Sequence, residues 1–539
     1  MGSVTGLRQR DTPTLHRSRL CENIQFQPIS LDQFKVLPDS DRRRGLSRAL
    51  YEEIRARIAD GTYAAGAALP SSRALAAERG LSRGTVTLVY EQLAADGFID
   101  TRPGATSRVA TGLAASPRRT ASDREVHSDA GRPAGGLSAV GSRIAVMDIR
   151  DAGPTAPAEI DFVYGPLAGG DFPTQTWLKA LRTVERQRVH RLEYEDPRGN
   201  LALRRALQTH LSRTRGVACS TEQLMIVNGS QQALDLCARL LVDPGDGVVV
   251  ENPGYRMAHH AFEACGAKLL GVDVDELGLR TDALAALGPA SVAYVTPTHQ
   301  FPLGSFLTMA RRRALLDWAA KRHAWVIEDD YDSEYRYSVR PEETLLSLDR
   351  RGCVVHVGTF SKTLSPQLRL GYMALPPSLV DMFVGAKRIA DRHAATGAQR
   401  ALAVLLEDGS YDRHVRRMRR QQQARQRALT DALAQHLGDR IRVQGAASGL
   451  HLVAWIPGLP ASAEPALVQA ARERSVRVYP VGPLYLPARA QSRTTIQRPA
   501  GLVMGYALLC TEAIEDGVRR LESALTALEG RVKERIAKP

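Results

Sequence analysis

Short apolar runs separated by helical stretches fill most of the chain beyond residue 160. The runs that look like buried strands are QLMIVNG, GVVVE, VAYVTP, AWVIED and CVVHVGT. Because they are almost continuously apolar, they predict strands that are covered on both faces. Strands that alternate with helices are typical of a parallel sheet between two helical layers. We therefore expect an α/β domain over residues 151–535, with a large subdomain at about 160–405 and a small subdomain at about 406–535.

The length of the chain, 539 residues, exceeds one ordinary core, so two or three domains are expected. Hydrophobic residues make up 44% and charged residues 24%, as in globular proteins that dissolve in water. No apolar run approaches the ~20 residues that cross a bilayer, and the N-terminus lacks the apolar region of a signal peptide. We expect a cytoplasmic protein with no membrane part. The six cysteines are scattered singly, which predicts reduced thiols and no metal site.

The N-terminal part begins with residues 1–40, which show no sustained period and predict a partly ordered leader. From Leu46 apolar residues recur at every fourth position, which predicts a helix that ends near Gly61. A second short helix is expected after Pro70, capped by Ser71 or Ser72. A third helix, beginning at Ser82, has an expected inward face of Val86, Val89, Tyr90 and Leu93.

A hairpin is predicted after the third helix, with its tip at Pro103 and Gly104. Residues 41–110 are therefore expected to form a winged helix, mainly α with a β wing. Residues 111–150 are predicted to be a flexible linker, because their first part has no aromatic residue and is dense in Ala, Gly, Ser, Arg and Pro.

The order of residues in this N-terminal unit is specific. The stretch LPSSRALAAERGLSRGTVTLVYEQLAADGFIDTRPGATSRV resembles the winged helix of the GntR class of bacterial regulators. In such a unit the third helix enters the major groove of DNA and the wing reaches the neighbouring backbone. A net charge of +14 permits contact with a polyanion but does not identify one. The candidate DNA contacts are Arg73, Ser82, Arg83, Thr85, Thr87 and Arg108; without the motif they would be ordinary exposed polar residues.

A lysine with groups suited to a cofactor lies in the second part. Lys362 follows the end of the strand-like run CVVHVGT, with Ser361 before it and Arg369 after it, and Asp329 and Tyr331 follow the run AWVIED. A lysine that forms a Schiff base needs a lowered pKa, a carboxylate for the pyridine nitrogen, and groups that bind phosphate. Each residue alone has an ordinary structural explanation, but their joint order favours a site.

The segments GTFSKTLSPQLRLGY, VIEDDYDSEYRY, GSQQALDL, ENPGY, TPTHQFPLG and YEDPRGNLALR together resemble the type I aminotransferase fold as found in MocR-type (GabR-like) regulators, a subfamily of the GntR class. The resemblance implies pyridoxal 5′-phosphate as cofactor, with Lys362 as the Schiff-base lysine. Asp329 would pair with the pyridine nitrogen, Tyr331 would bond the phenolic oxygen, and Tyr255 would stack on the ring. The implied phosphate ligands are Arg369, Ser361 and backbone N–H groups at Ser230 and Gln231.

Two positions depart from the family pattern. Where aminotransferases carry an Asn beside the ring oxygen, this chain has Phe301, so that contact is missing or comes from Gln300 or His299. The strand region GLVMGYALL lacks the family's carboxylate-binding Arg, and Arg498 is the nearest candidate for binding an effector. Asp330, Asp332 and Glu334 are expected to be local hydrogen-bonding and surface groups. The Arg-rich stretch from Asp412 is expected to be a solvated helix.

Three functions remain open from the sequence. The leading hypothesis is a transcriptional regulator that senses an amino acid, an amine or pyridoxal phosphate and binds DNA as a homodimer, as the resemblance implies. The second is a working aminotransferase with an accessory DNA-binding domain, for which at least a half-reaction would be expected. The third is a regulator whose large domain binds its ligand without a cofactor.

Overall fold

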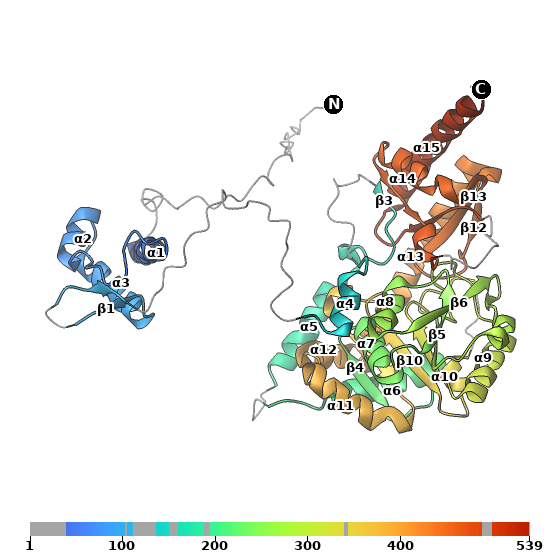
Figure 1. Ribbon diagram of the computed structural model, residues 1–539, viewed down its shortest axis with the longest axis horizontal. Coiled ribbons are helices and arrows are strands. Elements are labelled where there is room, and N and C mark those ends of the chain that lie inside the picture. The colour runs from blue at the N-terminus through green and yellow to red at the C-terminus, as the bar shows by residue number, and fades with distance from the viewer. Residues whose placement is uncertain are drawn as a thin grey trace, which may run out of the picture. The chain divides into compact units, whose positions relative to one another are not determined.

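The structure is a computed structural model that describes residues 39–102, 105–111, 136–149, 160–187, 193–338, 343–487 and 498–537. It forms two compact units, residues 1–134 and 135–539 (Figure 1). Residues 1–38 of the predicted leader, the predicted hairpin tip, and residues 112–135 of the predicted linker lie outside the described residues.

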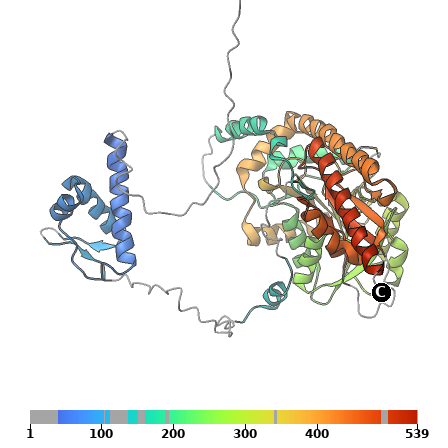
Figure 2. The same cartoon turned by 90° about the horizontal axis from the view of Figure 1, so that it is seen from above.

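The described part of the first unit has three helices and a two-stranded antiparallel ribbon, and the helix α1 extends along one side (Figure 2). Its elements are α1 (Asp39–Ala59), α2 (Ser72–Arg79), α3 (Arg83–Ala95), β1 (Ile99–Asp100) and β2 (Arg108–Val109). Ser71 caps α2, since its hydroxyl accepts a hydrogen bond from the Ala74 amide, and Gly80 ends it in the left-handed conformation. The predicted winged helix is confirmed.

The core of this unit follows the helical periodicity of the sequence. The apolar stripes of α1 and α3 pack together and bury Leu50, Ile54, Ile58, Val86, Val89, Tyr90 and Leu93. The Tyr90 hydroxyl donates a hydrogen bond of 2.7 Å to the Pro70 carbonyl, which ties α3 to the start of α2. The side chains that point away from this core are therefore left on the surface of α3.

The large sheet of the second unit has eight strands in the order β4-β11-β10-β9-β8-β5-β6-β7. The five predicted strand-like runs form β4 (Leu224–Val227), β5 (Gly247–Asn252), β8 (Val292–Val295), β9 (Trp325–Asp330) and β10 (Val354–Thr359). They run parallel to one another, together with β6 (Lys268–Asp275). The strands β7 (Gly278–Leu279) and β11 (Gly371–Ala374) are antiparallel to their neighbours, so the sheet is mixed and not purely parallel.

Helices cover this sheet on both faces, as predicted (Figure 1). Val248 and Val250 face α7, α8 and α11, whereas Val249 between them faces α9 and α10, because successive side chains of a strand point to opposite faces. The helices of this subdomain are α5 (Thr174–Glu185), α6 (Leu201–Arg215), α7 (Ser230–Leu241), α8 (Arg256–Cys265), α9 (Met309–Arg322), α10 (Leu345–Leu348), α11 (Val380–Asp391) and α12 (Thr396–Glu407).

The small subdomain contains a four-stranded sheet in the order β12-β13-β16-β15. Its elements are α13 (Ser410–Leu437), β12 (Arg442–Gln444), β13 (His451–Pro460), α14 (Glu464–Arg472), β14 (Val476–Arg477), β15 (Tyr479–Pro480), β16 (Pro499–Gly505) and α15 (Thr511–Ala537). The Arg-rich stretch is the helix α13, as predicted, but it is not solvated throughout, because Arg425 is buried and pairs with Asp171. The division of the chain differs from the expected one at its start, because β3 (Ile160–Asp161) pairs with β14 and Phe162 is buried in the core of the small subdomain.

The predicted linker also differs from the structure at its end. Residues 139–145 form the helix α4 (Ala139–Ala145), capped by the Ser138 hydroxyl, and Arg143 donates a hydrogen bond of 2.8 Å to the Ala264 carbonyl at the end of α8. This helix therefore belongs to the second unit. Within the described ranges, no helix has the length and apolar character needed to span a membrane, and no group of metal-ligating side chains was found.

Candidate functional site

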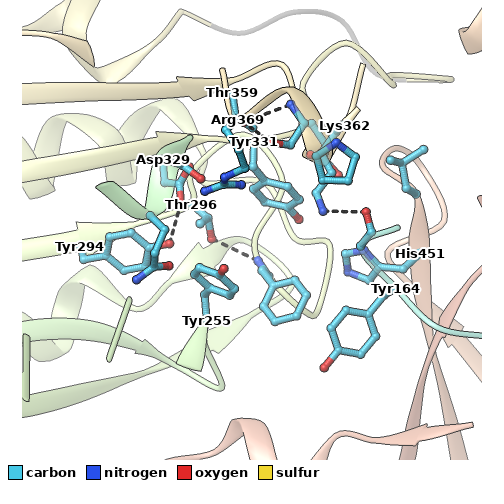
Figure 3. A pocket seen from close by; sticks show the side chains of 18 residues that line it. Tyr164, Tyr255, Tyr294, Thr296, Asp329, Tyr331, Thr359, Lys362, Arg369 and His451 are labelled. Carbon is cyan, nitrogen blue, oxygen red and sulfur yellow. Dashed lines mark hydrogen bonds between the residues drawn. The ribbon is translucent and has the colours of Figure 1, made fainter. Parts of the chain in front are cut away.

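A cavity of about 320 Å³ lies at the carboxyl ends of the parallel strands of the large sheet (Figure 3). Ligand sites of α/β proteins commonly lie at this edge, where side chains from several strand ends converge. The ends of β8, β9 and β10, the start of α7, the segment after β3 and the start of β13 all contribute to its wall. All eight predicted cofactor residues line it: Ser230, Gln231, Tyr255, Asp329, Tyr331, Ser361, Lys362 and Arg369.

Lys362 points into this cavity from the segment that follows β10 (Figure 3). Its Nζ donates a hydrogen bond of 2.9 Å to the backbone carbonyl of Gly165. Burial lowers the pKa of the Lys362 ammonium below its usual value, although Asp332 and Asp329 oppose this effect. A lowered pKa increases the fraction of free amine, which is the nucleophilic form that attacks a carbonyl carbon.

Asp329 is the penultimate residue of the strand β9 and is buried at the cavity wall. Its Oδ2 accepts a hydrogen bond of 2.8 Å from the hydroxyl of Tyr294 on β8, while its Oδ1 is buried and has no hydrogen-bond partner. Burial raises the pKa of Asp329 to about 6, with the Tyr294 hydroxyl acting in the opposite direction. A buried carboxylate oxygen without a partner is costly, so its place at the cavity wall suits a ligand with an N–H group.

A set of hydrogen-bond donors that could bind an anion lies where α7 begins. Arg369 donates a hydrogen bond of 2.9 Å from Nη2 to the Asn228 carbonyl, and its guanidinium lies over Gly229. A Cβ at position 229 would lie 2.6 Å from that nitrogen, and the φ of +80° also favours glycine there. Ser230 and Gln231 follow in the first turn of α7, where free N–H groups attract anions.

Thr359 and Ser361 complete this group of donors. The Thr359 hydroxyl donates a hydrogen bond of 2.9 Å to the Ser361 hydroxyl and accepts one of 3.1 Å from the Ser361 amide. Thr359 and Tyr294 were not predicted as site residues from the sequence. Thr359 lies at a strand end two residues before the predicted Ser361, which is the signal that could have identified it; Tyr294 has no such neighbour in the sequence.

Tyr331 lies between Asp329 and Lys362 (Figure 3). Its hydroxyl is 2.9 Å from His299 Nδ1, and the same Nδ1 is 2.9 Å from Asp332 Oδ2. An ionised carboxylate only accepts hydrogen bonds, so His299 Nδ1 carries the proton and faces both oxygens. The Tyr331 oxygen then accepts from His299, which leaves its own O–H free to donate into the cavity.

The expectation that Asp330, Asp332 and Glu334 are local hydrogen-bonding and surface groups is wrong in most respects. Asp330 and Asp332 are buried, and the Glu334 side chain is 13% exposed. Their partners Arg215 and His299 are distant in the sequence, whereas Ser333 is local. Asp330 is buried and accepts hydrogen bonds from Arg215 and Ser333, and the Arg215 guanidinium holds its pKa at about 2 despite burial. Asp332 is buried and lines the cavity. The strand end draws both carboxylates inward because their partners lie in the interior.

The ring position beside Tyr255 is occupied by Phe301. The two rings pack edge to face with their centres 5.8 Å apart, and Phe301 also packs against Tyr164 and Tyr331. Gln300 does not line the cavity, because its amide is used by the Pro253 and Phe301 carbonyls and by Glu251. His299 reaches the site through Tyr331. Gln300 and His299 were the two candidates to replace the missing Asn contact with the ring oxygen. Of these, His299 lies near the cavity, through its hydrogen bond with Tyr331.

Arg498 is not brought into this cavity. It forms an ion pair with Glu464 and lies over the ring of Tyr485, in a separate hollow of the small subdomain. The predicted contact of Arg498 with an effector is therefore wrong, because its guanidinium is bonded to Glu464. The two residues are 34 positions apart in the sequence, so this pairing could not be predicted.

The candidate DNA contacts lie on the surface of the first unit. Arg73, Ser82, Arg83 and Arg108 are exposed, and Thr85 and Thr87 are partly exposed. Some already have internal partners: the Ser82 hydroxyl caps α3 by accepting from the Thr85 amide at 3.1 Å, and Arg108 donates to the Gly66 carbonyl at 2.9 Å. Arg83 is exposed in the first turn of α3, so it is the best placed of the group to meet a phosphate or a base edge.

Comparisons with known proteins agree with this architecture. Residues 46–109 match the family model of bacterial regulatory proteins of the gntR family, and residues 164–502 match that of class I and II aminotransferases. The α-aminoadipate aminotransferase LysN from Thermus thermophilus, solved in complex with N-(5′-phosphopyridoxyl)-L-leucine, is 30% identical with a TM-score of 0.61, covering 69% of this chain and 93% of LysN.

Two regulators match over nearly their whole length. The probable rhizopine catabolism regulatory protein MocR of Rhizobium meliloti is 35% identical, covering 91% of this chain and 96% of MocR. The HTH-type transcriptional regulator TauR of Rhodobacter capsulatus is 31% identical, covering 92% of this chain and 99% of TauR. The chain therefore belongs to the MocR-type transcriptional regulators, in which a GntR-family DNA-binding domain is joined to an aminotransferase-like domain of fold type I.

Proposed function

We propose that this regulator holds pyridoxal 5′-phosphate on Lys362 and that a small effector entering the same cavity changes how the winged helices bind their operator. The observation that carries the proposal is the buried Asp329 Oδ1, which has no partner in a wall that also presents Lys362. An aspartate of this kind is what holds a pyridine nitrogen protonated.

The residues fit this cofactor from end to end. Arg369, Ser361, Thr359 and the first turn of α7 would bind the phosphate, and Asp329 would accept from the ring nitrogen. Tyr331 would donate to the ring oxygen, and Tyr255 offers a flat face to the ring. When bound, the cofactor supplies an aldehyde carbon that reacts with amines. The LysN structure, which was solved with a phosphopyridoxyl ligand, supports the same use of this fold.

The protein's own residues would set the conditions for that chemistry. Burial of Lys362 favours its uncharged amine, and the hydrogen bond to Gly165 fixes the direction of Nζ. The His299 and Asp332 pair would orient the Tyr331 hydroxyl proton toward the ring oxygen. The small subdomain contributes Leu450 and His451 to the wall, so a ligand in the cavity would touch both subdomains and bias their arrangement.

Regulation by this cavity further requires paired DNA-binding heads. Type I aminotransferases are normally built as dimers, so we propose a homodimer in the cytoplasm whose two winged helices meet spaced half-sites of double-stranded DNA. A ligand would alter DNA affinity only through a difference in its affinity for the two arrangements of the body. The candidate effectors remain an amine, an amino acid or the cofactor itself.

The comparisons favour regulation over primary catalysis. The relatives that match nearly the whole chain are named regulators, whereas an aromatic-amino-acid aminotransferase from Thermococcus litoralis covers 54% of it. Lys362, Asp329 and Tyr331 are nevertheless the residues that a transamination half-reaction needs. A turnover assay with an amino donor and a keto acid separates the two: we expect at most one turnover per site.

The cofactor proposal is tested on the purified full-length chain loaded with pyridoxal phosphate. We expect a visible absorbance band, and after borohydride reduction we expect a pyridoxyl adduct on the peptide that contains Lys362. Lys387 is an internal control in the same digest, because it is also buried but pairs with Asp391 outside the cavity. A colourless protein, or an adduct spread equally over both lysines, would refute the proposal.

A further inference from the structure

The positive charges at the cavity wall are all assigned once the cofactor is bound. Among the described residues that line it, Lys362 and Arg369 are the two with a basic side chain of the Lys or Arg type. Arg369 would lie against the phosphate. A primary amine that bonds to the cofactor carbon would displace Lys362, whose released amine would have the Gly165 carbonyl as partner and a pKa lowered by burial. No guanidinium of the described wall is then left for an anionic group on an effector.

The part of the wall beyond Lys362 is neutral and largely aromatic or apolar. It consists of Tyr164, Gly165, Phe301, Pro366, Leu450 and His451. His451 carries no charge at neutral pH, because burial lowers its pKa to about 3. Its Nε2 lies 3.0 Å from the Pro302 carbonyl and so carries the proton, which leaves Nδ1 as an acceptor. The wall therefore offers an acceptor here and no positive charge.

Asp332 adds a negative charge to the same wall. It is 2% exposed, and His299 holds its Oδ2 at 2.9 Å. Asp332 lines the same cavity as Lys362, and its carboxylate raises the pKa of the Lys362 ammonium against the effect of burial. A carboxylate on a ligand in this cavity would share the wall with the charge of Asp332, and like charges in a poorly solvated site repel strongly.

The small subdomain does not compensate for this charge. The strand β16, where the resemblance places the family's carboxylate-binding Arg, has the sequence PAGLVMG and no charged residue, and its Val503 packs in the same cluster as Phe301. The nearest arginine, Arg498, is held by Glu464. A carboxylate buried in this part of the cavity would lack a partner, which is costly in free energy.

We infer that the effector is a primary amine without a carboxylate, and that Asp332 is the residue that selects against the corresponding amino acids. Hydroxyls or a second amino group elsewhere on such a ligand would meet acceptors at Asp332 and at His451 Nδ1. This inference depends on the proposed function, since it assumes that the cofactor is bound to Lys362.

The test uses pairs of ligands that differ by one carboxylate. The cofactor-loaded full-length protein is titrated with 2-phenylethylamine against phenylalanine, cadaverine against lysine, and ethanolamine against serine. The dissociation constant is read from the change in cofactor absorbance, with each ligand expressed as its free base. We expect the amine to bind at least about tenfold more tightly than its amino acid in every pair, a difference of about 1.4 kcal/mol.

Variants assign this preference to a residue. Asp332→Asn removes the charge and keeps a polar group beside His299, so the preference for the amine should fall several-fold. Asp317→Asn, an exposed change on α9, is the matched control and should leave it unchanged. If Asp332→Asn does not fold, the titration of the unmodified protein still decides the effector class.

The outcomes separate this inference from the proposed function. A protein that shows no cofactor band refutes the proposed function itself. A protein that shows the band but binds the amino acids as tightly as the amines, or responds to none of these ligands, leaves the cofactor site intact and overturns only the inference.

Discussion

Asp329→Asn should stabilise the protein without cofactor while it destroys the cofactor site. Burial raises the pKa of Asp329 from its ordinary value of 3.8 to about 6. A group whose folded pKa is raised opposes folding above its unfolded pKa, and this penalty grows as the pH rises from about 4 to 6 and is constant beyond. A difference of about two pKa units corresponds to about 3 kcal/mol.

Asparagine removes this penalty and keeps the hydrogen bond from Tyr294. Urea denaturation of the cofactor-free protein, followed by circular dichroism, should therefore show a free energy of unfolding higher by up to about 3 kcal/mol at pH 8. The gain should fall to about half at pH 5, because the folded carboxyl is then mostly protonated. Asp317→Asn is exposed on α9 and should change neither value.

The same variant should lose cofactor affinity by about 100-fold or more, because the amide N–H would face the N–H of the ring in place of an acceptor. Absorbance titration with pyridoxal phosphate measures this loss. We assign Asp329 as a buried acceptor that destabilises the cofactor-free fold and binds an N–H group of the cofactor. This assignment would be refuted if the two cofactor-free proteins were equally stable at pH 8, or if the variant bound the cofactor with unchanged affinity.

Three further changes test other parts of the structure. Arg83→Ala should weaken DNA binding and reduce the slope of log affinity against log salt by about 1, with the cofactor band intact; an unchanged slope would remove Arg83 from the interface. Ser82→Ala should cost about 1 kcal/mol in a denaturation experiment, because α3 loses its cap, and no change would mean that the cap is not needed. Gly229→Ala should weaken pyridoxal phosphate binding, since its Cβ would displace Arg369, while DNA affinity stays the same; full retention of the cofactor would contradict the phosphate site.

Features that depend on near neighbours could be predicted from the sequence. The caps at Ser71 and Ser82 and the core face of Val86, Val89 and Leu93 follow from side chains within one or two helical turns of each other. The five buried strands were predicted because their apolar runs are short and continuous. The order of motifs then placed Lys362 and Asp329 in one site, since the carboxyl ends of parallel strands meet at one edge of the sheet.

Features that depend on distant pairing could not be predicted. Tyr294 becomes a partner of Asp329 only because β8 lies beside β9, and within its own run it looks like a core residue. Arg498, just before β16, pairs with Glu464 at the start of α14 and lies outside the cavity. The strand β11 lies between β4 and β10, and β3 pairs with β14. The local sequence of each of these strands does not indicate which strand it pairs with.

The electrostatic character of the cavity wall, to which His451 and Asp332 contribute, also could not be predicted from the sequence. His451 comes to the cavity from β13 of the small subdomain, about 90 residues beyond Lys362, and nothing around it in the sequence indicates a ligand site. Asp332 looked like a surface carboxylate among other acidic residues. Asp332 is buried because it bonds to His299, which is itself in the interior. The imidazole of His299 fits there because Gly304 and Gly449 have no side chain in its place.

We propose that the state of Lys362 controls the DNA-binding heads. This proposal is tested most directly by measuring the affinity of the full-length protein, with and without pyridoxal phosphate, for duplexes that the protein itself has selected from a random pool. We predict that the cofactor, alone or with 2-phenylethylamine, changes DNA affinity at least about fivefold in the unmodified protein and leaves Lys362→Ala unaffected. An equal change in both proteins, or none in either, would contradict the account.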